Sequence, residues 1–205
     1  MRSEILKTVV ILSAIIIRWI YNTKEFFALP PGYRINDKEC TLAGVGKGMI
    51  GSEDMAVGKN GLLFVTSGDL RKMMENSGNV ENPGSIWVMN LKETSRISLH
   101  KLEMKFFPHG RRFQPHGIHI SNLTDRMHVV SHNGDHSSVD IFTLKYNTDC
   151  WTKPSSQKCE IPVTALFLKS VKSTFFPNLG INDVVEKDND EFYVSQYHKF
   201  SIDRR

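Results

Sequence analysis

The sequence predicts an all-β protein built from repeated hairpins, and two observations carry this prediction. From residue 51 onward, short apolar runs alternate with turn-forming clusters of Gly, Pro, Asn and Asp such as "ENPGS", "SNLTDR" and "KDND". No long amphipathic helical pattern interrupts this part of the chain. A similar order of turn and strand also returns at a nearly constant spacing, which indicates an internal repeat.

Eight strands are expected, each an apolar or alternating run between two turns. In chain order they are "GLLFVTSG" (61–68), "GSIWVMNL" (84–91), "HGIHI" (116–120), "RMHVVSH" (126–132), "SVDIFTLKY" (138–146), "CEIPVTALFL" (159–168), "NDVVEK" (182–187) and "EFYVSQY" (191–197). Most have the length that strands of globular proteins show.

The repeat is clearest around two pairs of polar residues. Glu53 and Asp54 precede a turn and an apolar strand, and Asn182 and Asp183 take the equivalent places 129 positions later. Between them, in "HGIHISNLTDRMHVVSH", residues 118–119 occupy the paired positions, so that the two offsets are 65 and 64 residues. Short strands in repeated units predict a β-propeller, in which each unit forms one four-stranded blade.

Residues 51–205 are therefore expected to form about three propeller blades, after a lead-in segment at 22–50. A propeller closes into a ring of at least four blades, because an open ring leaves strand edges unpaired. We therefore expect this chain to be part of a larger structure.

The most apolar segment is residues 5–21, "ILKTVVILSAIIIRWIY", which predicts a hydrophobic helix within residues 1–21. Lys7 and Arg18 leave ten residues between them, fewer than the ~20 that a membrane-spanning helix needs. Three alternatives stay open: a retained signal-anchor or transmembrane helix whose end charges snorkel, a cleaved signal, and a buried core helix. The first two place the rest of the chain in the secretory pathway, membrane-anchored or extracellular.

Composition bounds the remaining possibilities. A chain of 205 residues that is 40% hydrophobic is long enough for one ordinary domain with a core. The net charge of +4 is modest and the basic residues are scattered, which argues against a nucleic-acid partner.

The cysteines and one glycosylation pattern agree with an oxidising compartment. Cys150 and Cys159 flank the loop "WTKPSSQK", so they are either a local disulfide or, with Cys40, buried thiols. Asn122 in "NLT" fits the N-glycosylation acceptor pattern, which is meaningful only for a lumenal protein.

The two acidic positions predict metal binding. Neighbouring side chains on a strand point to opposite faces, so Glu53 and Asp54 would serve two different sites. Where the inner strands of a propeller converge, clustered carboxylates repel each other unless a cation lies between them. Oxygen donors of Glu, Asp, Asn and backbone carbonyls select calcium rather than zinc. We therefore expect two calcium ions along the axis; the alternative is that these residues are solvated turn acids.

Several longer motifs carry a family resemblance. "GSEDM", "NGLLFVTSG", "PGSIWVMNL", "QPHGIHI", "HVVSH" with "SSVDIF", and "FPNLGINDVV" with "EFYVS" resemble the paraoxonases, from about residue 40 to 198 and in the same order. Paraoxonases are calcium-dependent arylesterases and lactonases with a six-bladed propeller and an N-terminal hydrophobic anchor. The resemblance covers the first half of a family member.

The resemblance implies two sets of calcium ligands. Glu53 and Asn182 match ligands of the family's catalytic calcium, the ion that polarises an ester or lactone carbonyl. Asp54, the backbone carbonyl of Ile118 and Asp183 match the ligands of a structural calcium. The remaining ligands of the catalytic ion, an Asn and an adjacent Asp and Asn, fall in the half of the family pattern that lies beyond this chain.

The resemblance also implies a histidine pair. His116 of "QPHG" matches the base proposed to deprotonate the attacking water, and His132 of "VVSH" matches the residue that orients it. Without the resemblance, either histidine would be read as a packed or surface imidazole. Cys40 matches the family cysteine that pairs with one near the C-terminus.

Three functions follow as hypotheses. The first is a calcium-dependent hydrolase of aryl esters and lactones, a secreted or membrane-anchored protein that contacts a membrane or lipoprotein surface through its N-terminal segment. The second is a non-catalytic, membrane-anchored paraoxonase-like chaperone or accessory subunit of a membrane protein. The third is a truncated product without independent function, because half a propeller leaves open edges.

Overall fold

The computed structural model describes Ser13, Arg18 and residues 48–69, 83–92, 99–133, 136–147, 162–172, 180–188 and 191–196. The chain divides into two compact units, residues 1–41 and 42–205, and every strand named below belongs to the second. No helix within the described residues is long and apolar enough to cross a membrane. The expected disulfide and Cys40 lie outside the described residues, as does nearly all of the expected N-terminal helix.

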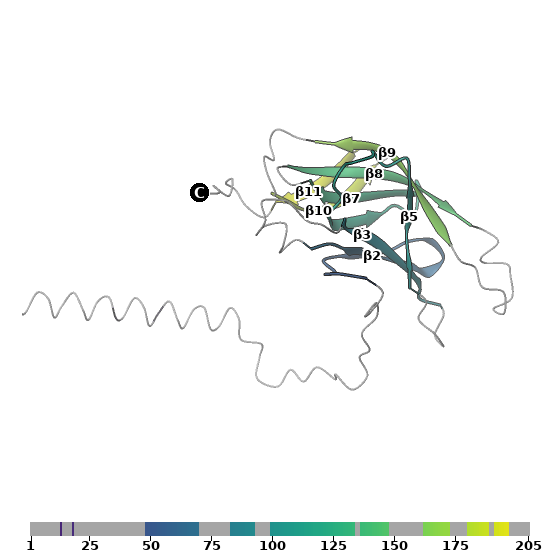
Figure 1. The fold of residues 1–205 in the computed structure, drawn as a ribbon, viewed down its shortest axis with the longest axis horizontal. Coiled ribbons are helices and arrows are strands. Elements are labelled where there is room, and N and C mark those ends of the chain that lie inside the picture. The colour runs from purple at the N-terminus through teal and green to yellow at the C-terminus, as the bar shows by residue number, and fades with distance from the viewer. Residues whose placement is uncertain are drawn as a thin grey trace, which may run out of the picture. The chain divides into compact units, whose positions relative to one another are not determined.

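The described residues of the second unit form three β-sheets (Figure 1). The first sheet has the order β1 (Met55–Val57), β2 (Leu62–Ser67), β3 (Ser85–Asn90), β4 (Leu99–Lys101). The second has the order β5 (Glu103–Lys105), β9 (Val163–Val171), β8 (Ser137–Tyr146), β7 (Arg126–His132), β6 (Pro115–Ile120). The third is the hairpin of β10 (Ile181–Asp188) and β11 (Glu191–Gln196).

All eight expected strands are present, and the all-β prediction is confirmed for the described residues. The sequence did not predict β1, β4 and β5, because each has only three residues and so shows no period. Each neighbouring pair is antiparallel except β5 and β9, which are parallel. The arrangement of the sheets as propeller blades stays a prediction.

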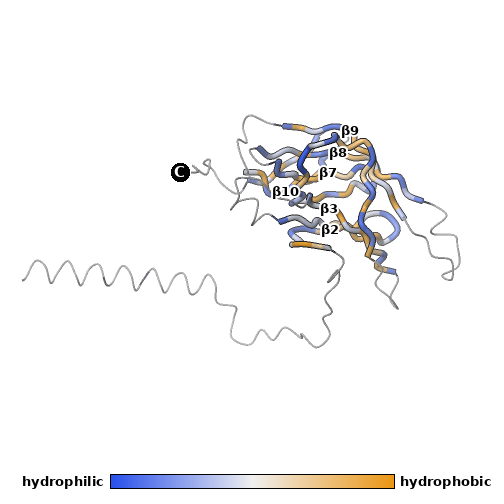
Figure 2. The backbone as a smooth tube through the Cα atoms, in the orientation of Figure 1, coloured by the Kyte–Doolittle hydropathy of each residue, from blue (hydrophilic) through white to orange (hydrophobic). Residues whose placement is uncertain are grey.

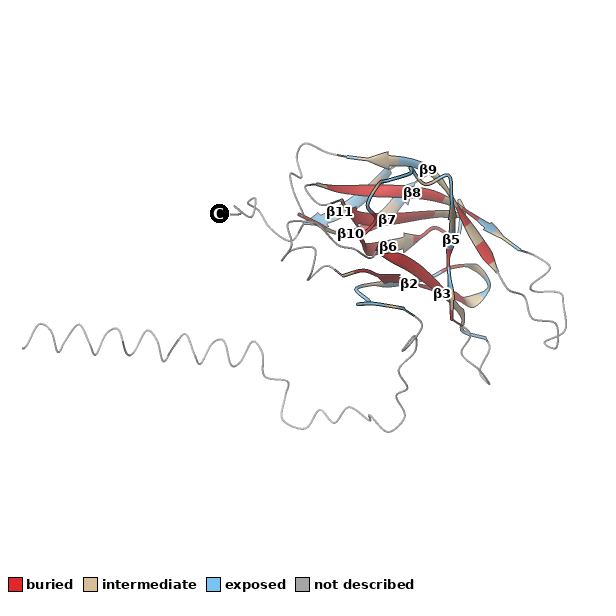
Figure 3. Ribbon diagram, viewed as in Figure 1, coloured by how far each residue is buried: buried red, intermediate tan, exposed pale blue. Residues whose placement is uncertain are grey.

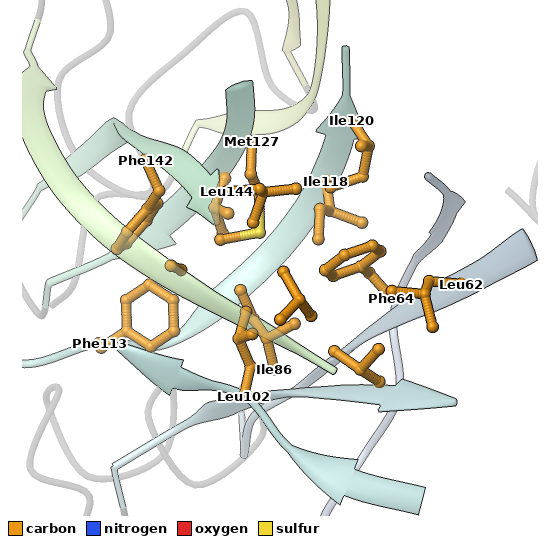
Figure 4. Close-up of a cluster of buried hydrophobic side chains, with 14 residues drawn as sticks. Leu62, Phe64, Ile86, Leu102, Phe113, Ile118, Ile120, Met127, Phe142 and Leu144 are labelled. Carbon is orange, nitrogen blue, oxygen red and sulfur yellow. The ribbon is translucent and has the colours of Figure 1, made fainter. Parts of the chain in front are cut away.

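The main hydrophobic core lies between the first two sheets (Figure 4). Phe64 and Ile86 of the first sheet meet Ile118, Met127 and Phe142 of the second, and all five are almost fully buried. Burying a side chain of this size contributes about 1.5–3 kcal/mol, so this contact is a main source of stability. Figure 3 shows the buried residues concentrated along β2, β7 and β8.

A second, smaller core lies on the opposite face of the second sheet. Val130, Val139 and Ile141 pack there against Ile181 and Val184 of β10. The second sheet is thus apolar on both faces, and the hydropathy along its strands changes from residue to residue (Figure 2). This packing brings β10 against β6, and β1 also contacts β6. A strand of each of the other two sheets therefore lies at β6, the edge strand of the second sheet.

Candidate metal and active site

Asp54 and Asp183 have the same backbone surroundings. The amide of Asp54 donates to Thr66 Oγ1 at 3.0 Å, and the following amide donates to Asp54 Oδ1 at 2.7 Å. The amide of Asp183 donates to Ser195 Oγ at 3.1 Å, and the following amide donates to Asp183 Oδ1 at 2.7 Å. Each hydroxyl lies twelve residues after its aspartate. The repeat seen in the sequence therefore extends to individual hydrogen bonds.

Two bulges lie where β6 meets β10. The register of β6 shifts between Pro115 and Ile118, and that of β10 shifts between Ile181 and Val184. Gly117, in the first bulge, faces the second so closely that a β-carbon would lie 2.6 Å from the Asn182 carbonyl oxygen. The same β-carbon would also lie 2.6 Å from the neighbouring Cα and Oδ1 of the aspartate at position 183. Only glycine allows the two strands to approach this closely.

Near these bulges, polar groups from all three sheets lie close to the start of β6. Asp54 Oδ2 accepts a hydrogen bond from the Ile118 amide at 2.8 Å. Glu53 Oε2 lies 3.9 Å from His116 Nε2. The Asp183 carboxylate is also close enough to His116 to act on its protonation. The carboxylates of the two repeated pairs therefore all lie near the start of β6.

His116 and His132 form a second part of the same region. Their ring centroids are 5.3 Å apart and the ring planes are nearly perpendicular, at 82°. His116 is the second residue of β6 and His132 is the last of β7, so the antiparallel pairing of these strands brings the two rings to one end of the hairpin. His132 Nδ1 lies 2.9 Å from Ser137 Oγ on β8, which leaves Nε2 as its other polar atom.

Both rings favour the neutral form. Burial lowers the pKa of His116, and the Glu53 carboxylate is the largest influence in the opposite direction. Burial lowers the pKa of His132 to about 3, with a further contribution from His116. A neutral imidazole has one nitrogen free to accept a proton, but a pKa of about 3 makes His132 a weak base, so general-base chemistry near neutral pH would fall to His116.

The described residues hold no group of three or more His, Cys, Asp or Glu side chains in an arrangement that could bind a metal ion. The expected ligand sets also include the Ile118 carbonyl and the Asn182 amide, which are not among those four side-chain types. Glu53, Asp54 and Asp183 each act on the pKa of His116, so three carboxylates lie near this ring. Their oxygens, with the amide and carbonyl oxygens of the expected ligand sets, fit a hard cation such as calcium.

Several residues of this region were not predicted from the sequence. Gly117 is the contact between β6 and β10, and Ser137 is the partner of His132. A glycine between His116 and Ile118 is a signal for a bulge or a close approach. No sequence pattern marks Ser137, because its role depends on the pairing of β7 with β8.

These features define an all-β protein with carboxylates and a histidine pair gathered at one end of neighbouring hairpins. Residues 35–203 match the Arylesterase family, so the chain belongs to this family. The paraoxonase resemblance drawn from the sequence motifs is thereby confirmed.

The curated relatives are paraoxonases of vertebrates. Human "Serum paraoxonase/arylesterase 1" is 32% identical over 157 residues, which cover 73% of this chain and 38% of the relative. Human "Serum paraoxonase/lactonase 3" is 29% identical over 154 residues, 74% of this chain and 38% of the relative. "Serum paraoxonase/arylesterase 2" of Gallus gallus is 28% identical over 155 residues. The chain spans well under half the length of these relatives.

Proposed function

We propose that the protein is a calcium-dependent hydrolase of aryl esters and lactones. Membership of the arylesterase family suggests a hydrolase. The observation that carries the proposal is the approach of Glu53, His116 and His132, since a carboxylate beside a buried, neutral histidine pair is a recurring arrangement for activating water.

In this proposal His116 accepts a proton from water as the water attacks the substrate carbonyl. The nearly perpendicular His132 ring borders His116, and Ser137 holds His132 through Nδ1. Glu53, 3.9 Å from His116, is the proposed calcium ligand next to this ring. His116 thus accepts the proton, and His132 and Ser137 orient its ring.

Calcium is proposed at two positions in this region. Glu53 and Asn182 would contribute to a catalytic ion, and Asp54, the Ile118 carbonyl and Asp183 to a structural one. A bound catalytic calcium would supply Lewis-acid polarisation of the substrate carbonyl. The proposal is supported by the oxygen donors that gather at the bulges of β6 and β10.

The activity is tested with phenyl acetate and δ-valerolactone in the full-length protein at saturating calcium. His116→Gln and Glu53→Ala are each expected to lower kcat/KM about a hundredfold or more, because His116 accepts the water proton and Glu53 is a proposed calcium ligand. Glu103→Ala is the matched control, since Glu103 is exposed on β5. Equal activity in Glu53→Ala and the unchanged protein would reject the role assigned to Glu53. Absence of hydrolysis in the unchanged protein would favour the non-catalytic accessory role.

Fold and localisation complete the proposal. The three hairpins β1–β2, β6–β7 and β10–β11 are proposed to be the inner halves of propeller blades, which is supported by their repeated hydrogen bonds and neighbouring first strands.

The protein is proposed to be extracellular or membrane-anchored in the secretory pathway, and the names of its relatives place those proteins in serum.

Asn122 is proposed to carry an N-linked glycan. It is exposed in the turn between β6 and β7, next to Leu123, which is 95% exposed. A glycan at this turn would point into solvent without disturbing a sheet. The protein secreted from eukaryotic cells is expected to lose mass on treatment with an N-glycosidase, whereas Asn122→Gln is expected to lack this part of the mass. If N-glycosidase treatment removes the same mass from both proteins, or none from either, the proposal is contradicted.

A further inference from the structure

A buried polar cluster lies on the second sheet, outside the site described above. Arg111 Nη2 lies 2.6 Å from Asp140 Oδ1, 2.8 Å from Ser138 Oγ and 3.0 Å from Ser170 Oγ. The Asp140 side chain is completely buried and that of Arg111 is 17% exposed. The guanidinium also lies near the Phe107 ring, 5.5 Å from the centroid. Arg111 is thus fixed to β8 and β9 through side chains alone.

A buried ion pair is weak evidence for stability. Removing two charges from water costs several kcal/mol per ion, and an apolar pair of similar volume often stabilises a protein equally well. Arg111–Asp140 can therefore be replaced by apolar residues without a necessary loss of folding. What such a replacement would lose is the fixed geometry of an arginine held by three acceptors.

The cluster reaches the hairpin turn that carries His132. Ser138, one of the Arg111 acceptors, directly follows the serine that contacts His132 Nδ1. Asn133, which directly follows His132, lies 2.9 Å from Ser138 Oγ. In the amide orientation that satisfies both its donors and its acceptors, Asn133 accepts from Arg111 Nη2 at 3.2 Å and donates to the Arg112 carbonyl. Arg111 therefore contacts β8 and Asn133, the residue that directly follows β7.

The same arginine begins the segment that leads to His116. Between them, Phe113 is 2% exposed in the main core. Gln114 accepts a hydrogen bond from the His132 amide through its backbone carbonyl at 3.0 Å. Since only four residues separate Arg111 from His116, the side chain of Arg111 ties this segment to the strand that follows His132.

We propose that Arg111 and Asp140 are positioning residues that fix the His116 and His132 rings against each other. The inference rests on the proposed function, in which these rings handle the proton of the attacking water. Neither Arg111 nor Asp140 contacts substrate in this role. The pair joins the segment that precedes His116 to β8, the strand that follows His132. It thereby fixes the distance and the angle between two rings that belong to different strands.

The test replaces the pair by apolar residues and observes the rings directly. In the full-length protein with Arg111→Met and Asp140→Leu combined, the ring resonances of His116 and His132 are expected to shift and broaden in nuclear magnetic resonance spectra. If the hydrolase activity is present, kcat is expected to fall about tenfold with KM unchanged, because misplaced rings affect the reaction more than binding. Unchanged ring resonances in the folded double variant would overturn the inference.

Two other histidines and one ion pair provide the controls. His100 on β4 and His119 on β6 belong to strands that carry none of the side chains of the cluster, and their resonances are expected to stay in place. Equal shifts at all four histidines would mean general loosening and would also overturn the inference. Lys59→Met removes the ion pair with Asp125 at the other end of the hairpin, and it is expected to leave His116 and His132 unchanged.

Two further comparisons keep the result decisive. If the double variant fails to fold, Arg111→Lys keeps the charge and loses the multiple contacts, and it is expected to shift the same two rings. Unshifted rings in Arg111→Lys would overturn the inference. Because the spectra need no substrate, absence of hydrolysis in the unchanged protein would reject the proposed function alone.

Discussion

Calcium is expected to raise the melting temperature of the full-length protein, and Asp54→Ala and Asp183→Ala are each expected to abolish that rise. A ligand that binds only the folded state at a hundred times its dissociation constant stabilises it by about 2.7 kcal/mol. For a domain of 150–250 residues, that corresponds to a rise of roughly 5–10 °C, and for a longer protein the rise is smaller. Thermal unfolding with calcium and with a chelator measures the difference.

The two aspartates are expected to act alike because their surroundings are alike. Each holds the following amide with Oδ1 and is itself held by a hydroxyl twelve residues later. Asp54→Ala also removes the hydrogen bond to the Ile118 amide, so it is expected to lower the melting temperature even with chelator. The informative quantity is therefore the calcium-dependent difference within each variant.

Asp188→Ala is the control for this experiment. Asp188 is an exposed aspartate at the far end of β10, and its replacement is expected to keep the full calcium response. A melting temperature that is the same with calcium and with chelator in the unchanged protein would remove the basis for both ions. If the calcium-dependent rise in melting temperature persists in both Asp54→Ala and Asp183→Ala, calcium binds at another site.

The repeat made much of this arrangement predictable from the sequence. Similar spacing of Glu53–Asp54 and Asn182–Asp183 before apolar strands requires similar hairpins, and similar hairpins bring the same positions to the same end. The eight longer strands followed from apolar runs between turn residues. The three-residue strands did not, because they form only where the longer strands provide an edge to pair with.

Other features depended on contacts that no local pattern encodes. Gly117 matters because of β10, about 65 residues further along the chain. Arg111 reads as one basic residue in a loop, and its burial follows from acceptors on β8 and β9. His128 belongs to an apolar run, and the sequence does not distinguish its environment from that of a half-exposed strand residue.

His128→Leu is expected to remove a large part of the loss of stability on acidification. Burial lowers the pKa of His128 to about 4, and the side chain is 2% exposed on β7. In the unfolded chain the pKa is about 6.5, so between pH 6.5 and 4 the unfolded state binds more protons. The free energy of unfolding therefore falls as the pH is lowered through this window, by about 3 kcal/mol from this group.

Leucine is suited to this position. His128 lies 5.7 Å from the Phe192 ring, between centroids, and its buried Nδ1 makes no hydrogen bond within the described residues. An apolar side chain therefore leaves no polar partner unsatisfied there. Chemical denaturation at several pH values between 7 and 4 would compare the slopes of the two proteins, in which the carboxylates contribute equally.

Val130→Ala separates this effect from ordinary loss of packing. Val130 is fully buried, and it packs in the second core with the residues of β10. Because it carries no proton, its truncation is expected to lower the free energy of unfolding by a similar amount at every pH. Parallel curves for the unchanged protein and His128→Leu across this window would show that His128 is protonated equally in the folded and unfolded states.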